Sequence, residues 1–174
     1  TVRATRNFPI TYQKTHPMMV KSLGMVKKAC ALANNECGHL DDEKCKYIVQ
    51  ACDEVIEGKL NQWFVTDVIQ GGAGTSTNMN ANEVIANRAA QLAGKPLGTY
   101  DYIHPNDNVN FGQSTNDVFP TAGKLTCLFL VDGLIEEITL LEESLLDKSL
   151  EFNDVIKLGR THLQDAVPIR MGQE

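Results

Sequence analysis

Residues 120–152 read PTAGKLTCLFLVDGLIEEITLLEESLLDKSLEF, and this stretch decides the fold class of the chain. Its apolar residues recur every three or four positions, which is the spacing of a helix face. They are Leu125, Leu128, Val131, Leu134, Ile138, Leu141 and Leu145. About 30 helical residues make a rod about 45 Å long. A compact domain of 174 residues is too small to cover that rod. We therefore expect its partners in further sequence or in other subunits.

The residues before this stretch also predict helices, because helical periodicity dominates and strand alternation is scarce. A first helix is expected from Pro17 to about Asn34, since proline suits a first helical turn. A second is expected from about Asp42 to Glu57, capped by Asp41 or Asp42 and ended by Gly58. The third is expected to start near residue 78 and to end before residue 94. The sequence therefore predicts an all-α fold.

The composition narrows the class of function. Apolar residues make up 43% and charged residues 22% of the chain, as in ordinary soluble globular proteins. The net charge of −6 gives no general attraction to nucleic acid or anionic membranes. We see no run of about 20 apolar residues that could cross a bilayer and no signal peptide in residues 1–8. We expect a cytoplasmic protein with no nucleic-acid or membrane partner.

The five cysteines do not predict a metal site or a disulfide framework. Their number is odd, and the spacing of the first four does not match a CxxC zinc motif. We expect free thiols on helices.

The first of three polar segments is residues 70–80, QGGAGTSTNMN, a glycine-rich turn that leads into a helix. Glycines let backbone N–H groups approach a ligand closely. A helix N-terminus adds unpaired donors and a partial positive charge, which favour a carboxylate or phosphate. The segment matches neither a P-loop nor a dinucleotide fingerprint. Taken alone, the segment is better explained by turn and capping chemistry.

The second polar segment runs from His104 through residues 105–112 to the sequence QSTND at residues 113–117. Ser114 or Thr115 can cap the long helix, with Asp117 completing a capping box. A cap needs one side chain, however, and here four hydrogen-bonding residues stand together. We expect them to direct several donors at one point. His104 precedes a proline in this loop, so turn chemistry is an alternative role for it.

The third polar segment is residues 159–168, GRTHLQDAVP, where Thr161 precedes His162. A histidine can give or take a proton near neutral pH, and His162 has polar neighbours. We expect His16 and His39 to be structural. Taken together, the three segments predict a site lined by neutral donors for a small dianion, without a metal or phosphate motif. Such a lining suits proton chemistry next to a carboxylate.

These segments resemble the signature regions of the fumarase/aspartase superfamily, in order and spacing, over nearly the whole chain. The matching stretches are NFPI at 7–10, TSTNMNANEVIANR at 75–88, QSTNDVFPTA at 113–122 and GRTHLQDAVP at 159–168. The QGGAGTS run at 70–76 and TDVI at 66–69 are similar to the aspartase branch. THLQ at 161–164 is found in some aspartases and is near the fumarase form.

The resemblance implies an N-terminal lyase domain at residues 1–113 and the start of a central helical bundle at residues 114–174. It implies a homotetramer in which three chains build each active site, without an organic cofactor. The implied reaction is reversible deamination of L-aspartate to fumarate and ammonia through an aci-carboxylate intermediate. One alternative is a class II fumarase, which adds water. Another is a non-catalytic fragment that acts through helix association.

The resemblance also implies roles for single residues. Thr75, Ser114 and Thr115 would hold the β-carboxylate, and Thr161 would reach the α-carboxylate. Asn116 and His162 would face the amino group and are the catalytic candidates, with His162 alternatively managing the leaving group's proton. A second, non-catalytic carboxylate site of fumarases matches His104, Asn106 and Asp107.

One part of the family pattern is missing. The family's base is a serine on a mobile loop that contains a Ser-Ser pair, and no such pair occurs in residues 1–174. We expect that loop beyond Glu174, and we expect the fragment to be inactive by itself.

Overall fold

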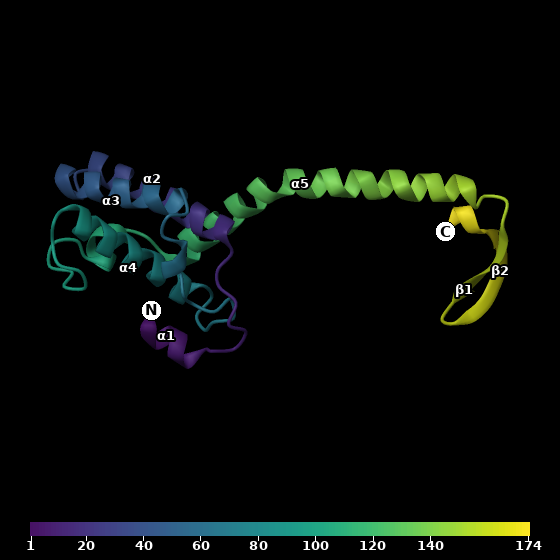
Figure 1. Ribbon diagram of the computed structural model, residues 1–174, viewed down its shortest axis with the longest axis horizontal. Coiled ribbons are helices and arrows are strands. Elements are labelled where there is room, and N and C mark those ends of the chain that lie inside the picture. Colours follow the sequence, from purple (N-terminus) through teal and green to yellow (C-terminus); the bar gives the residue numbers. More distant parts are fainter. The chain divides into compact units, whose positions relative to one another are not determined.

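The computed structural model describes residues 1–174 and divides them into two compact units, residues 1–129 and 130–174. The elements are mostly helical, with one small two-stranded sheet (Figure 1). In chain order they are α1 (Val2–Asn7), α2 (Pro17–Glu36), α3 (Asp42–Ile56), η1 (Asn61–Trp63), α4 (Thr75–Leu92), η2 (Pro105–Val109), α5 (Thr115–Glu151), β1 (Ile156–Thr161), β2 (Gln164–Arg170) and η3 (Met171–Gln173).

The first two long helices begin where their capping residues predict. Pro17 is the first residue of α2, and the His16 ring accepts the Met18 N–H at 3.2 Å. Asp41 caps α3 by accepting the Lys44 N–H at 2.8 Å. Gly58, with φ +78°, follows the end of α3. The expected helices at 17–34 and 42–57 are confirmed to within two residues.

Helix α4 begins at Thr75, three residues before the expected start near Asn78. The difference arises because the capping position is occupied by Gly74, with φ +91°, and carries no side-chain cap. A glycine in the left-handed region turns the chain into the helix without the serine, threonine or aspartate that usually marks a helix start.

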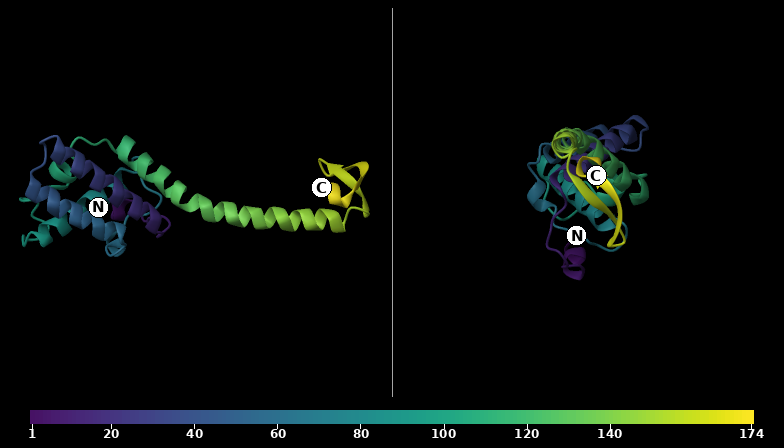
Figure 2. Two further views of the ribbon diagram at one scale, coloured as in Figure 1. Left: turned by 90° about the horizontal axis from the view of Figure 1, so that it is seen from above. Right: turned by 90° about the vertical axis from the view of Figure 1, so that its right-hand side faces the viewer.

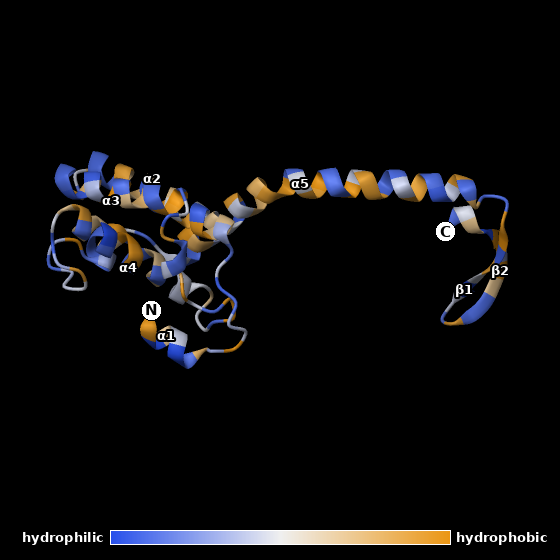
Figure 3. Ribbon diagram, viewed as in Figure 1, coloured by the Kyte–Doolittle hydropathy of each residue, from blue (hydrophilic) through white to orange (hydrophobic).

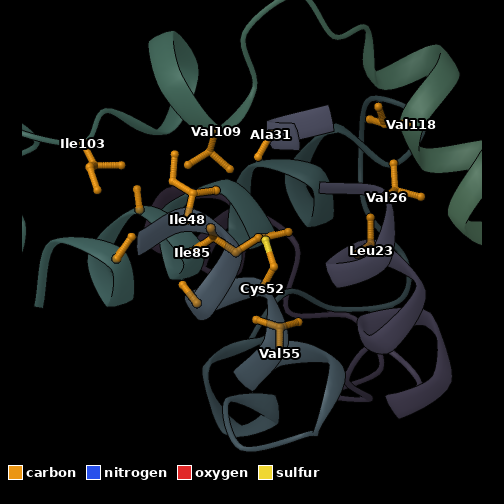
Figure 4. Packing of buried hydrophobic residues seen from close by; sticks show 14 of the residues in the cluster. Leu23, Val26, Ala31, Ile48, Cys52, Val55, Ile85, Ile103, Val109 and Val118 are labelled. Atoms are coloured by element: carbon orange, nitrogen blue, oxygen red, sulfur yellow. The ribbon is translucent and has the colours of Figure 1, made fainter. Parts of the chain in front are cut away.

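The core of the first unit lies between α2, α3 and α4. Leu23, Ile48, Cys52, Val55 and Ile85 are completely buried there, and Figure 4 shows them packed together. The loop around η2 and the first turns of α5 close this core with Ile103, Val109 and Val118. Buried apolar surface at this centre holds the starts of α4 and α5 in place.

Helix α5 has 37 residues and is about 55 Å long at the rise of an α-helix. Its first part joins the core through Val118 and Ala122, and the Thr126 hydroxyl lies 3.0 Å from the Ser22 hydroxyl. Most of its later apolar side chains are exposed, and apolar bands follow one another along the ribbon (Figure 3). The exposed residues beyond the expected stripe are Phe129, Leu130, Ile135, Leu140, Leu146 and Leu150.

Exposed apolar residues therefore cover more of the surface of α5 than one stripe, with charged residues such as Glu136, Glu142 and Asp147 among them. A helix of this kind is normally buried in a large core or a membrane. By length and composition alone α5 could cross a membrane, so the expectation that no stretch reaches that requirement is wrong. A core helix of a soluble bundle passes the same test.

The second unit contains a β-hairpin that the sequence did not predict. Strands β1 and β2 pair antiparallel, from Ile156 opposite Arg170 to Thr161 opposite Gln164, and Figure 2 shows the hairpin near the C-terminus. Its two turn residues, His162 and Leu163, have φ of +47° and +63°. Both central residues of a type I′ turn need positive φ, which normally selects asparagine and glycine. This turn lacks both, and the usual sequence signal is therefore missing.

Candidate functional site

The starts of α4 and α5 are joined by a buried side chain. Asn78, in the first turn of α4, is 1% exposed and donates from its amide nitrogen to the Thr115 hydroxyl oxygen at 3.2 Å. Thr115 is the first residue of α5. The structure thus brings together the helix starts of the first and second polar segments. Because the Thr115 oxygen accepts from Asn78, its own hydroxyl proton is available to another acceptor.

Ser114 and Asn116 flank Thr115 on the surface. The Ser114 hydroxyl oxygen accepts the Asn116 N–H at 3.2 Å and so caps α5. Asp117 does not return the second bond of a capping box. The Asn116 side chain is exposed, and its amide is free to meet a ligand. Three consecutive residues therefore offer neutral hydrogen-bonding groups at one helix N-terminus, where partial positive charge favours an anion.

Thr75 is exposed at the start of α4, and its hydroxyl donates to the Gly72 carbonyl at 2.6 Å. To donate to a bound carboxylate, the Thr75 hydroxyl would have to give up its hydrogen bond to the Gly72 carbonyl. The loop itself is held from within, because the Gln70 side chain accepts the Thr77 N–H at 2.9 Å and donates to the Thr77 hydroxyl at 2.6 Å.

Two phenyl rings explain two of the three glycines of this loop. A Cβ atom at Gly71 would lie 2.9 Å from the Phe8 ring, and one at Gly74 would lie 2.5 Å from the Phe119 ring. Both distances are too short for carbon atoms that are not bonded. The glycines are needed for these contacts and for the positive φ of Gly74, as well as for any approach of backbone N–H groups to a ligand.

Asp67 ties the N-terminal segment to this loop. Its carboxylate accepts the N–H groups of Ile10, Thr11, Tyr12 and Ile69 and the Thr11 hydroxyl, at 2.7 to 3.2 Å. Burial alone would raise the pKa of this carboxyl. The bonds from the Ile69 N–H and from Thr11 and Tyr12 outweigh burial and hold the pKa well below its usual range. Asp67 therefore remains ionised and keeps Phe8 near the glycine loop.

A buried lysine below the α5 start was missed by the sequence reasoning. Lys27 of α2 is completely buried, and its ammonium donates to Asn110 Oδ1 and Gln113 Oε1, both at 2.8 Å. Asn110 Oδ1 also accepts from the amides of Asn78 and Asn82 at 3.2 Å. Burial lowers the pKa of Lys27 to about 8.

A signal for this lysine was present in the sequence. Lys27 follows Val20 by seven residues and Leu23 by four, and it precedes Ala31 by four. That spacing places it on the buried face of α2, among residues that the structure shows to be inside.

The loop around η2 is organised by His104. Its Nδ1 accepts the N–H groups of Asn106 and Asp107 at 3.2 Å, and the Asp107 carboxylate lies 3.3 Å away. Asn106 and Asp107 are exposed. The turn role that the sequence left open for His104 is therefore present in the structure, while a second carboxylate site at these residues remains a prediction.

Thr161 and His162 belong to the second unit, at the turn of the hairpin. Both are exposed, and beside them Arg160 lies 3.6 Å from Asp165. Leu163 is 93% exposed although its φ is positive. Left-handed backbone costs a residue with a side chain about 1–2 kcal/mol. Such strain is commonly retained where a turn serves a contact or a ligand.

The cavities lie elsewhere. One of about 550 Å³ in the first unit is lined by Leu60, Trp63 and Val84 and by the paired Glu54 and Arg88, and it contains none of the predicted site residues. All five cysteines are free thiols, and no group of three His, Cys, Asp or Glu side chains could hold a metal. The predicted residues of the first unit therefore lie on its open surface, outside this cavity.

Comparisons with known proteins give a consistent picture. A family model described as "Lyase" matches residues 1–174. The chain is 60% identical to an aspartate ammonia-lyase from Bacillus sp and 52% identical to a class II fumarate hydratase from Halobacterium salinarum, and it covers 37% of each. A crystal structure of fumarate lyase:delta crystallin from Brucella melitensis matches 99% of the chain with a TM-score of 0.80 at 51% identity, over 40% of its own length. The chain thus spans well under half the length of these relatives.

Proposed function

The chain belongs to the lyase family, and we propose that the protein containing it is an aspartate ammonia-lyase. The reaction is the reversible conversion of L-aspartate to fumarate and ammonia. The observation that carries this proposal is the bond from Asn78 to Thr115. It joins two helix starts whose side chains are neutral donors, which is the lining that a dicarboxylate needs. The 60% identity to an aspartate ammonia-lyase supports it.

In the proposed reaction a base removes a proton from the carbon next to the β-carboxylate. Negative charge then accumulates on that carboxylate, which becomes a doubly charged aci-carboxylate. Thr75, Ser114 and Thr115 donate hydrogen bonds to these oxygens. Removing one preorganised donor of this kind typically costs about 10²–10³ in rate. The base itself is supplied by the remainder of the full-length protein.

The amino group is handled by Asn116 and His162 in this proposal, and Thr161 binds the α-carboxylate. Loss of ammonia needs a proton on the leaving nitrogen, and the His162 imidazole can hold or pass that proton. The exposed turn at His162 and Leu163 supports a role in a site completed by other chains.

Assembly as a homotetramer is part of the proposal. Many apolar residues of α5 are exposed in the single chain. Packing α5 against the same helix of other subunits would remove this surface from water, and the gain is about 25 cal/mol for each Å² buried. The active sites would then be composite, with residues from more than one subunit.

Fumarate absorbs at 240 nm, so a direct assay on the full-length protein tests the proposal. We expect absorbance to rise with L-aspartate and not with L-malate. A rise with malate alone would instead identify a class II fumarase, in line with the 52% identity to a fumarate hydratase. Variants Thr115→Val and His162→Gln should each lower kcat/KM for aspartate at least tenfold, and normal activity in both would exclude the proposed site.

A further inference from the structure

Lys27 is an unusual residue to find in the core of the first unit. Its side chain is completely buried, and lysines are almost never fully buried unless they are paired with an acid. Here the ammonium is held only by the amide oxygens of Asn110 and Gln113, at 2.8 Å each. Its neighbour Lys28 instead forms an ordinary half-exposed ion pair with Asp53 at 2.6 Å.

The two hydrogen bonds from Lys27 support the binding segment, residues 113–117, in two different ways. Gln113 immediately precedes Ser114 in the chain, so one bond fixes the backbone that enters α5. Asn110 accepts from Asn78 through the same oxygen, and Asn78 donates in turn to the Thr115 hydroxyl. One ammonium group therefore fixes Gln113 at the start of this segment and also fixes Asn110, the acceptor that holds the Asn78 amide beside Thr115.

A purely structural role does not account for this arrangement well. A buried charge without an opposite charge is costly, and replacing buried ion pairs by well-packed apolar residues is often neutral or stabilising. The positive charge lies below a helix N-terminus that is proposed to receive a doubly charged intermediate. Attraction between the two is less weakened by solvent because the lysine is shielded from water.

We propose that Lys27 is a positioning residue of the lyase reaction. Its buried ammonium fixes Asn110 and Gln113 so that Thr115 presents its hydroxyl proton to the substrate carboxylate, and its charge favours the dianion. This inference rests on the proposed function. It is tested separately, by comparing Lys27→Met with Lys28→Met.

The test uses the full-length protein with Lys27→Met, and with Lys28→Met as the matched control on the same helix. We expect Lys27→Met to lower kcat/KM for aspartate about 100-fold, mostly through kcat, which is the typical effect of a disturbed preorganised donor. Its thermal midpoint should stay close to that of the wild type. Lys28→Met should remain within twofold of the wild type in both kcat and KM.

The measured kcat, KM and folded tetramer distinguish a positioning role of Lys27 from a purely structural one. A Lys27→Met protein with kcat and KM within twofold of the wild type overturns the inference, as does one whose loss of activity only parallels a loss of folded tetramer. If Lys27→Met fails to fold, Gln113→Met decides, because it removes one acceptor and leaves the lysine in place. It should lower kcat several-fold, and an unchanged kcat overturns the inference.

The wild-type assay tests the proposed function separately. If the wild type acts on malate and not on aspartate, the same variants are measured with malate. If it acts on neither diacid, the proposed function fails and this inference fails with it.

Discussion

The contact between Gly74 and the Phe119 ring leads to a sharp prediction about stability. Gly74 has φ +91°, and a Cβ atom there would lie 2.5 Å from the ring. For Gly74→Ala, left-handed backbone costs about 1–2 kcal/mol. Forcing the ring aside adds about 1–3 kcal/mol. We therefore expect the free energy of unfolding to fall by about 2–5 kcal/mol.

Gly98 supplies the matched control, because its φ is +77° and a Cβ atom there would meet nothing within 4 Å. Gly98→Ala should cost only the backbone part, about 1–2 kcal/mol. The assay is urea unfolding of the 174-residue chain, monitored by tryptophan fluorescence. Trp63 is the only tryptophan and lies in the first unit, so the signal reports on that unit.

A double variant isolates the clash. Phe119→Leu alone should destabilise the chain through lost packing, and Gly74→Ala should cost less in its presence, by about 1–3 kcal/mol of coupling. If Gly74→Ala were no more harmful than Gly98→Ala, or if the two substitutions at positions 74 and 119 were additive, the ring would not press on the loop and our account of its glycines would be wrong.

Three further predictions concern charges and thiols. Because the folded pKa of Asp67 is lowered, its stabilisation is present above the unfolded pKa of 3.8 and is lost as pH falls through the folded pKa. Urea midpoints of wild type and Asp67→Asn should differ by a constant amount above about pH 4 and converge in stronger acid; a constant gap at all pH values would refute this. Arg88 donates to both Glu54 oxygens at 2.6 and 2.7 Å. Arg88→Lys should lower the free energy of unfolding by about 1 kcal/mol in urea titrations at neutral pH; an unchanged free energy would show that the two-pronged contact is unimportant. Alkylation followed by mass spectrometry should label the exposed Cys37 in the native chain and the buried Cys52 only after unfolding; equal rates would contradict the packing of α3.

Local signals in the sequence predicted most of the helical fold. Pro17 and Asp41 mark the starts of α2 and α3 by mechanisms that involve only neighbouring residues, and both helices form where they were expected. The start of α4 was misplaced because Gly74 adopts left-handed backbone without a side-chain cap. The hairpin was missed because the turn at His162 and Leu163 lacks glycine and asparagine. In addition, Pro168 lies within β2, and a proline within a run of residues argues against a strand.

The candidate site was predictable only in part, for a physical reason. Side chains such as Ser114 and Thr115 show their chemistry in the sequence, because several donors stand together at a helix start. The support beneath them depends on contacts between distant segments, such as Lys27 with Asn110 and Gln113. Helical spacing places Lys27 on the buried face of α2, but only the folded chain shows what its ammonium meets.

The glycine loop held between Phe8 and Phe119 has a consequence for how a ligand arrives. Rings on both sides and the internal bonds of Gln70 leave the loop little freedom to bend toward a ligand. The start of α4 therefore has its shape set before any ligand arrives. Any adjustment around a bound ligand must then come from segments other than this loop.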